Sequence, residues 1–122
     1  LCYQMWGKEN QSAVRKGAKY IAKNSKLKWG TEFADLYGHY DEAQAMMNRG
    51  GQEWKDYNAM MRDEVLKNQN PDGTWKSPDG KLRAVGASFQ GCGAESVFYR
   101  TALCSLMMEV YYRFLPGTGG GH

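Results

Sequence analysis

The sequence lacks any long run of apolar residues. No stretch approaches the roughly 20 consecutive apolar residues that a membrane-spanning helix requires. A hydrophobic content of 42% with 24% charged residues is instead ordinary for a globular chain, and 122 residues are enough for one modest domain. We therefore expect no transmembrane segment.

Cysteine and net charge are also limited. The three cysteines, Cys2, Cys92 and Cys104, lack metal-ligand spacing, and their odd number indicates no compartment. The net charge is only +3. Most of the excess lies on one predicted helix and the loop after it, where no base-reading motif is present. The residues concerned are Arg15, Lys16, Lys19, Lys23, Lys26 and Lys28. This pattern favours a solvated helix face over a nucleic-acid site, so no nucleic-acid partner is predicted.

Helical periodicity is the main pattern that is present, and it predicts an all-α fold. The first three segments are amphipathic or mixed, with Asn10 as the expected N-cap of the first. Gly50–Gly51 is expected to end the second. The fourth segment is apolar nearly all round, which predicts burial on most sides. The predicted helices are 11–24, 35–48, 52–68 and 97–115.

A turn with an aromatic anchor follows the third predicted helix. Pro71 cannot continue that helix, and Asp72 followed by Gly73 favours a turn. The Gln69 amide is expected to satisfy carbonyl groups at the helix end. Trp75 should fold back and bury its indole. The segment is therefore predicted to fasten the loop to the end of the helix.

An internal repeat underlies the helices. Residues 15–24 align with residues 60–69, matching Ile21 with Leu66 and Asn24 with Gln69 at a period of 45 residues. Periods of this size are typical of repeats built from helix pairs. The first copy has Lys28–Trp29–Gly30 where the second has its Asp–Gly–x–Trp turn.

The second copy resembles the Gln–Trp repeat of squalene cyclases and prenyltransferases. The residues that carry this resemblance are Leu66, Gln69, Asp72, Gly73 and Trp75. The family fold is an α/α-toroid, in which outer helices form a rim and inner helices line a central cavity. The resemblance implies that segments 11–24 and 52–68 are outer helices and that 35–48 and 97–115 are inner ones.

Two helical hairpins form only an incomplete ring, and the first seven residues look like the last turn of a helix whose start is missing. We therefore expect a partial chain or an assembly partner, with residues 1–116 as the repeat segment. Residues 117–122 form a Gly-rich tail that is expected to be flexible. The irregular Gly-rich loop before the last helix, 76–96, is either an ordered loop over the cavity mouth or a mobile surface loop.

Class II terpene cyclases of the resembled family protonate their substrates with an acid from an Asp–x–Asp–Asp motif. A neighbouring hydrogen-bonded carboxyl makes such an acid strong enough. This sequence contains no such cluster, because its acidic residues are isolated or spaced along surfaces. No catalytic residue is therefore assigned, and any such acid would lie outside this chain.

Asp35, His39 and Glu42 are spaced to share one face of a helix, where a divalent metal could bind. The alternative is that Asp35 favours the helix N-terminus and shares a hydrogen bond with His39. The prenyltransferase branch of the resembled family holds zinc with Asp, Cys and His, and no cysteine here has a matching spacing. No cofactor is predicted.

Aromatic residues on the supposed inner helices are candidates for lining a cavity, where their π faces could stabilise cations. The alternative is that they are simply core. The candidates are Tyr37, Tyr40, Phe98 and Tyr99.

The leading functional interpretation is a non-catalytic squalene-cyclase-like repeat segment that acts in protein–protein assembly. Its partners would be other protein chains or further repeats of the same protein, with a hydrophobic or isoprenoid ligand as a second candidate. The alternative is the C-terminal part of a class II terpenoid cyclase or related prenyltransferase whose catalytic acid lies upstream. The compartment is not indicated.

Overall fold

The computed structural model describes residues 1–8, 10–31, 33–78 and 93–113 of the chain. Over these residues the protein is all-α, as predicted, and the described part contains one isolated β-bridge but no strand. The helices are α1 (Cys2–Met5), α2 (Ser12–Asn24), α3 (Leu36–Arg49), α4 (Gly51–Lys67), α5 (Gly93–Met108) and α6 (Val110–Arg113).

The α3–α4 hairpin has the helix ends that the sequence predicts. Asp35 is the N-cap of α3, and its side chain accepts a hydrogen bond from the Gly38 backbone N–H at 2.9 Å. The turn between the two helices needs positive φ at two successive residues, Gly50 (66°) and Gly51 (73°). Glycine adopts this conformation at no steric cost, so the hairpin closes without strain.

The start of α2 differs from the prediction. Asn10 is not the N-cap, because the helix begins at Ser12 after Gln11, and no side chain caps it. The backbone carbonyl of Asn10 instead accepts a hydrogen bond from the Arg15 guanidinium at 2.7 Å. Asn10 thus lies one residue too early in the chain to cap the helix.

The bounds of the last helix also differ from the prediction. It begins at Gly93 rather than Val97, and it is interrupted at Glu109 before α6. Glycine lowers helix propensity without forbidding a helix, which explains the early start. The predicted end at Leu115 and the predicted tail lie outside the described residues, as does most of the predicted 76–96 loop.

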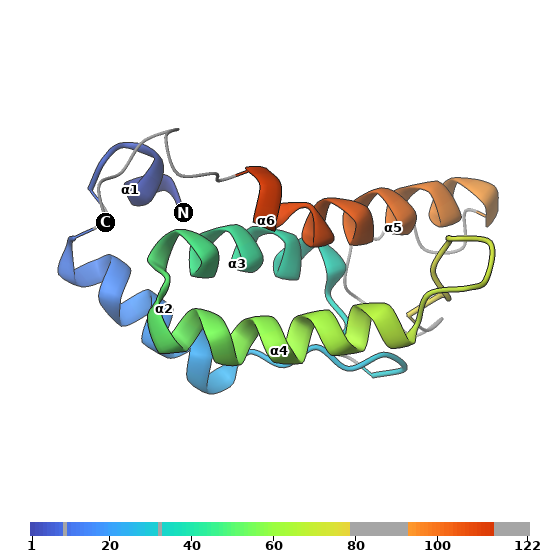
Figure 1. The fold of residues 1–122 in the computed structure, drawn as a ribbon, viewed down its shortest axis with the longest axis horizontal. Helices are drawn as coiled ribbons and strands as arrows, with labels where there is room; N and C mark the ends of the chain where they lie inside the picture. Colours follow the sequence, from blue (N-terminus) through green and yellow to red (C-terminus); the bar gives the residue numbers. More distant parts are fainter. Residues whose placement is uncertain (9, 32, 79–92, 114–122) are drawn as a thin grey trace.

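The helices lie in two layers (Figure 1). α2 packs beside α4 in one layer, and α3 packs beside α5 in the other. α3 and α4 are antiparallel neighbours, whereas α5 runs in the same direction as α3. Equivalent helices of the two sequence repeats therefore occupy the same layer. The described helices form two layers but no ring, so the toroid stays a prediction.

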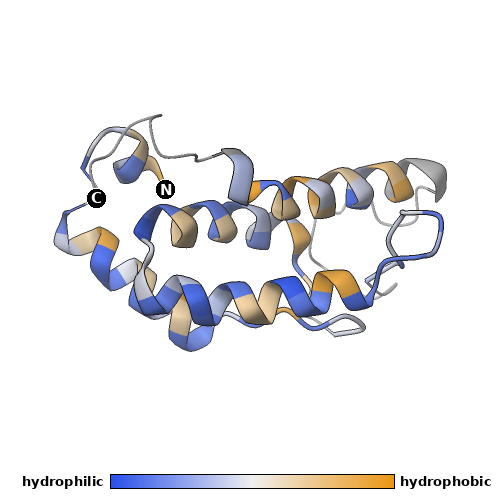
Figure 2. Ribbon diagram, in the orientation of Figure 1, coloured by the Kyte–Doolittle hydropathy of each residue, from blue (hydrophilic) through white to orange (hydrophobic). Residues whose placement is uncertain are grey.

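The core lies between the two layers. Hydrophobic and hydrophilic residues alternate along α4, whereas α5 is apolar over most of its length (Figure 2). The largest fully buried side chains are Leu36, Met46, Met61, Met107, Val65, Val110 and Cys104. The prediction that the last helix is buried on most sides is too strong, because Phe98 is 77% exposed and Tyr112 is 75% exposed.

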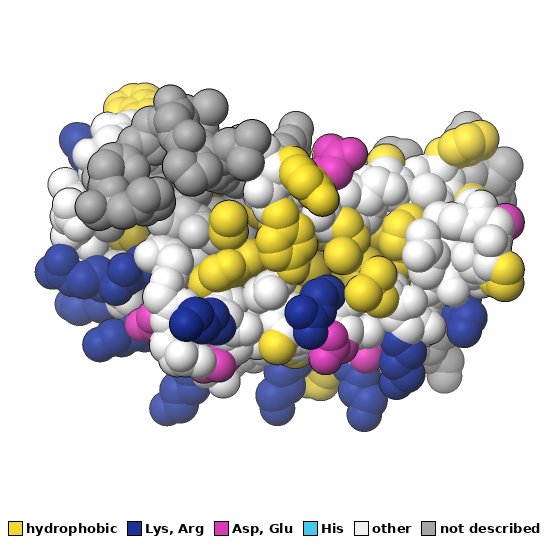
Figure 3. All heavy atoms as spheres, viewed as in Figure 1, with side chains coloured by type: hydrophobic (Ala, Val, Ile, Leu, Met, Phe, Trp, Pro, Cys, Tyr) yellow, Lys and Arg dark blue, Asp and Glu magenta, His cyan; other side chains and the backbone are white. Residues whose placement is uncertain are grey.

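Hydrophobic side chains also form a band on one face of the molecule, between α4 and the layer of α3 and α5 (Figure 3). At the seam between α4 and α6, the rings of Trp54 and Tyr111 lie 5.9 Å apart at a tilted angle. This distance is within the range of favourable aromatic pairs. The Tyr111 hydroxyl donates a hydrogen bond to the Asn58 amide oxygen, which joins the same two helices.

Candidate functional site

Trp75 fastens the loop after α4 to that helix, as predicted. Its ring is 4% exposed, and its indole N–H donates a hydrogen bond to the Val65 carbonyl at 2.8 Å. Gln69 and Trp75 face each other in an isolated antiparallel bridge. Because the indole is both buried and hydrogen-bonded, the loop is held through one side chain.

The predicted role of Gln69 is wrong. Its amide donates to the Gly73 carbonyl inside the turn at 3.2 Å, and not to the end of the helix. The neighbouring Asn68 takes the helix-end role, since its amide donates to the Glu64 carbonyl at 2.8 Å. Asn68 lies four residues after Glu64 and has the shorter side chain, so it reaches that carbonyl directly.

The turn at Asp72 and Gly73 forms as predicted. The Asp72 carboxylate accepts hydrogen bonds from the Thr74 hydroxyl at 2.6 Å and from the Thr74 backbone N–H at 3.0 Å. These hydrogen bonds lower the pKa of Asp72. Gly73 has φ of 87°, a value that other residues rarely adopt. Leu66, the remaining residue of the motif, is 49% exposed on α4.

The equivalent loops of the two repeats lie side by side, which the sequence did not predict. The Trp29 indole donates to the Lys76 carbonyl at 3.0 Å, and the Gly30 backbone N–H donates to the Pro78 carbonyl at 2.7 Å. The Trp29 backbone N–H also donates to the Glu64 carboxylate at 2.8 Å. The first loop is therefore attached both to the second loop and to α4.

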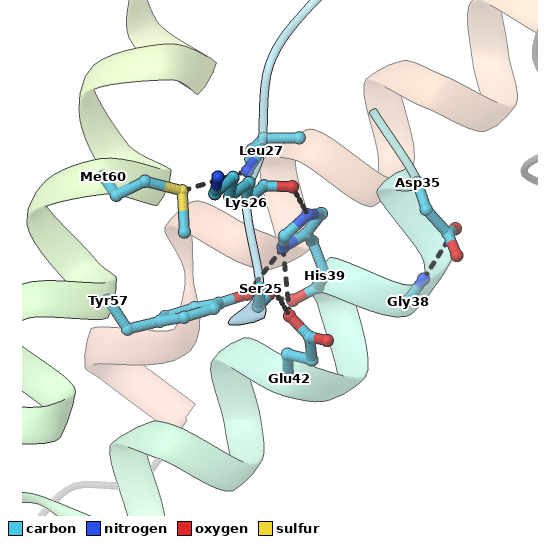
Figure 4. A network of polar contacts seen from close by, with 9 residues as sticks. All are labelled: Ser25, Lys26, Leu27, Asp35, Gly38, His39, Glu42, Tyr57 and Met60. Atoms are coloured by element: carbon cyan, nitrogen blue, oxygen red, sulfur yellow. Dashed lines mark hydrogen bonds and ion pairs between the residues drawn. The ribbon is translucent and has the colours of Figure 1, made fainter. Parts of the chain in front are cut away.

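A buried polar network links α3, α4 and the segment after α2 (Figure 4). His39 is 4% exposed and Tyr57 is 3% exposed. The His39 Nδ1 atom lies 2.9 Å from the Tyr57 hydroxyl and 3.2 Å from a Glu42 carboxylate oxygen. The same oxygen accepts a hydrogen bond from the Ser25 hydroxyl. On the other side of the ring, Nε2 lies 3.0 Å from the Lys26 carbonyl.

The protonation of this network follows from its partners. A carbonyl oxygen only accepts hydrogen bonds, so the His39 Nε2 atom carries a proton. Burial by itself raises the pKa of Glu42. Hydrogen bonds from His39, Ser25 and Tyr57, together with the charge of His39, outweigh the effect of burial. The pKa of Glu42 therefore lies below its usual value. The pKa of Tyr57 is raised by burial and then by the Glu42 charge and hydrogen bond. Glu42 is therefore ionised at neutral pH, and Tyr57 keeps its proton.

The structure does not assemble Asp35, His39 and Glu42 into a metal site. Asp35 points away from the other two side chains and caps α3 through Gly38 (Figure 4). Both ring nitrogens of His39 already have protein partners. Over the described ranges, no group of three or more His, Cys, Asp or Glu residues is placed to hold a metal ion. The alternative prediction is confirmed, because Asp35 caps α3 and its carbonyl accepts a backbone hydrogen bond from the His39 N–H at 2.9 Å.

The four aromatic candidates for cavity lining occupy two kinds of environment. Tyr37 is 53% exposed and Phe98 is 77% exposed, whereas Tyr40 and Tyr99 are half-buried against the core. Burial raises the pKa of Tyr99, and the nearby Tyr37 and Asp35 raise it further. The side chain of Tyr99 on α5 therefore lies close to the start of α3. A role in lining the cavity of a closed ring stays a prediction.

A half-open apolar cavity of about 220 Å³ lies where α1, α2 and α3 meet. The Gln4 side chain lines this cavity, and its amide donates a hydrogen bond to the Ala45 carbonyl at 2.9 Å. Cavities for drug-sized ligands are larger, at about 300–1,000 Å³, so this space suits at most a small apolar molecule. The residues that line it are Leu1, Tyr3, Gln4, Ala13, Val14, Gly17, Ala18, Ile21, Ala45 and Met46.

The fold and these contacts define an all-α protein in which the α3–α4 hairpin packs against α2 and α5, and the two repeat loops are joined by hydrogen bonds. No protein-family model, curated protein or solved structure matches the chain. Among the described helices, none is long and apolar enough to cross a membrane.

Proposed function

We propose that this chain is a non-catalytic helical-repeat segment that acts in protein–protein assembly. Its partner is a further helical layer, supplied by another chain or by further repeats of the same protein. The observation that carries the proposal is the exposure of large aromatic side chains on the layer of α3, α5 and α6. Tyr37 is 53% exposed, Phe98 is 77% exposed and Tyr112 is 75% exposed. Aromatic residues are enriched at protein–protein interfaces.

The packing of α5 against α3 supports this mode of association. α5 buries Leu103, Cys104 and Met107 in the core that it shares with α3. Phe98 on α5 and Tyr112 on α6 lie outside that core. A further helix packed against α5 and α6 would bury these two rings, as α3 already buries Leu103, Cys104 and Met107. Repeat proteins gain stability from such contacts between neighbouring units.

The buried network also fits a non-catalytic role. The His39 ring has protein partners at both nitrogens, and the Ser25 hydroxyl is bonded to Glu42 rather than to the imidazole. The Glu42 carboxylate that accepts from Ser25 has a lowered pKa, so it is a weak base for activating a nucleophile. The network therefore serves to join α3, α4 and the segment after α2.

A photo-crosslinking amino acid at position 98, used in cells of the source organism, tests the proposal. Lys55, which is exposed on α4, is the matched control position. We expect a discrete protein adduct from position 98 and none from position 55. With the identified protein purified, Phe98→Ala should weaken its Kd at least tenfold without changing the unfolding transition, as a hot-spot truncation does. The same adducts from both positions, or a Kd changed by less than about twofold, would contradict the proposal.

One observation favours the alternative, the C-terminal part of a terpenoid cyclase or related prenyltransferase. Tyr37 and Phe98 expose their rings on the layer that the resemblance makes cavity-facing, and such rings can stabilise carbocations. An intact-mass measurement on material from the source organism separates the two functions. A longer polypeptide that carries Asp–x–Asp–Asp and turns over isoprenoid substrates would establish the enzyme.

A further inference from the structure

Positive charge is concentrated in one segment of the chain. Residues 8–28 contain seven Lys and Arg residues and one Glu, which gives this segment a charge of +6. Because the whole chain carries +3, the remaining residues carry −3. Positive and negative charges are therefore unevenly distributed along the chain, although the net charge is small.

The fold makes α2 a rigid basic ridge. Its four basic residues follow one another at intervals of one, three or four residues, which places them on one side of the helix. All four are exposed, whereas the opposite side packs Val14, Ala18 and Ile21 toward the core and the cavity. The residues of this basic ridge are Arg15, Lys16, Lys19 and Lys23.

The basic ridge has no acidic partner within the described part of the protein. The two ion pairs found there join His39 to Glu42 and Arg62 to Asp63, and neither includes a residue of α2. Figure 3 shows Lys and Arg side chains gathered at the end of the molecule where α2 begins. An uncompensated basic surface attracts an anionic one, over a distance set by ionic strength.

An exposed aromatic residue lies beside the basic ridge. Tyr20 follows Lys19 on α2 and is 70% exposed. The exposed residues of α1 are not part of the ridge, because α1 packs on the side of α2 that faces the cavity. Tryptophan and tyrosine are favoured at the level of lipid headgroups, since their rings are apolar but carry one polar group.

The type of basic side chain indicates which class of anionic partner the ridge can bind. Six of the seven basic residues in the segment are lysines. Lysine acts as a hydrated point charge and cannot form the bidentate contacts by which arginine recognises a single carboxylate or phosphate. Such a surface suits a diffuse negative field rather than one specific anionic group. We propose that the basic ridge of α2 docks on a membrane surface rich in anionic phospholipids.

This docking leaves α2 on the surface of the bilayer. The apolar side of the helix is already used inside the protein, so α2 cannot insert that side into lipid. The attraction is mainly electrostatic, with the Tyr20 ring beside the ridge at the level of the headgroups. It is independent of the protein partner proposed above, which would contact α5 and α6.

Vesicle co-sedimentation tests the proposal. We expect the protein to bind vesicles that contain about one third phosphatidylserine and to stay in solution with phosphatidylcholine alone. Binding should fall steeply as salt rises from about 0.1 M to about 0.5 M, since salt screens the attraction. Comparable binding to both kinds of vesicle would overturn the proposal.

Two matched triple variants assign the binding to the basic ridge. Replacing Lys16, Lys19 and Lys23 with Gln should lower the partition coefficient on the order of a hundredfold, because each lysine near an anionic surface contributes about a factor of five. The control replaces the exposed lysines Lys55, Lys67 and Lys76 with Gln and removes the same charge elsewhere. It should change the partition coefficient much less. An equal loss in both variants would show that only net charge matters and would overturn the proposal.

Two further measurements complete the test. Both triple variants should unfold at the same urea concentration as the parent protein, so that lost binding cannot reflect lost folding. Tyr20→Ala should remove most of the binding that survives at high salt, because that part is apolar. Tighter binding of polyuridylate RNA than of anionic vesicles at the same salt concentration would assign the basic ridge to nucleic acid instead.

Discussion

Trp75 shows how much of the loop structure depends on a single side chain. Its ring is buried, and its indole N–H reaches the Val65 carbonyl in the last turns of α4. Trp29 has the equivalent place in the first repeat, but it is half-buried and donates to the Lys76 carbonyl of the other loop. The same residue type thus closes one loop on its own helix and ties the other loop to its neighbour.

Trp75→Ala is expected to lower the free energy of unfolding by about 3–5 kcal/mol, because it removes a buried ring and leaves a cavity. Urea denaturation followed by circular dichroism measures this change. Trp6→Ala is the control, since that ring is 83% exposed, and it should change stability by less than about 0.5 kcal/mol. Similar values for the two variants would show that Trp75 is not buried.

At the scale of single elements, the helix starts differ in how they are capped. α3 begins with a side-chain cap at Asp35, whereas α2 begins without one. α2 therefore depends on its packing against α3 and α4 to stay helical, as most helices in proteins do. This contrast allows a direct test of the cap.

Asp35→Ala should destabilise the protein by about 1 kcal/mol, because the Gly38 backbone N–H loses its partner. Asn10→Ala should have an effect within about 0.5 kcal/mol, since that side chain caps no helix. Thermal or urea unfolding of the two variants provides the comparison. Asp35→Asn is a useful third variant, because asparagine also caps helices and should restore most of the lost stability.

At the scale of the whole molecule, the His39 network joins segments that are far apart in the sequence. His39 and Glu42 come from α3, Tyr57 comes from α4, and Ser25 and Lys26 follow α2. Because these segments are held together by polar contacts as well as by the core, stability should depend on the charge of Glu42.

The pKa of Glu42 is lower in the folded protein than its usual value of about 4.5. The ionised carboxylate therefore contributes its full stabilisation above pH 4.5. This contribution is lost as the pH falls through the lower pKa of the folded state. Glu42→Gln should therefore cost about 1–2 kcal/mol near neutral pH and progressively less in acid. Urea unfolding at a series of pH values measures the difference between the two proteins. Glu109→Gln, at an exposed position outside the network, is the control. A constant difference between parent and Glu42→Gln across the acid range would show that the charge is not what stabilises the network.

Local sequence features predicted the elements well where one residue sets the backbone. Gly50 and Gly51 marked the α3–α4 turn, and Asp72 with Gly73 marked the second turn, because these residues adopt conformations or make hydrogen bonds that others cannot. Boundaries without such a residue were less accurate, as at the start of α5. The network around His39 was missed in part, because Ser25 and Tyr57 are 17 and 18 residues away from their partners and no periodic pattern links them.

The sequence by itself determined the all-α class, the turn between α3 and α4, and the burial of Trp75, since helical periodicity and turn chemistry act over a few neighbouring residues. Only the tertiary structure decided that the two repeat loops lie side by side, that Asp35 turns away from His39, and that α2 presents a basic ridge without acidic partners. These features depend on which segments meet in space. That is set by the packing of the two layers, which no local pattern encodes.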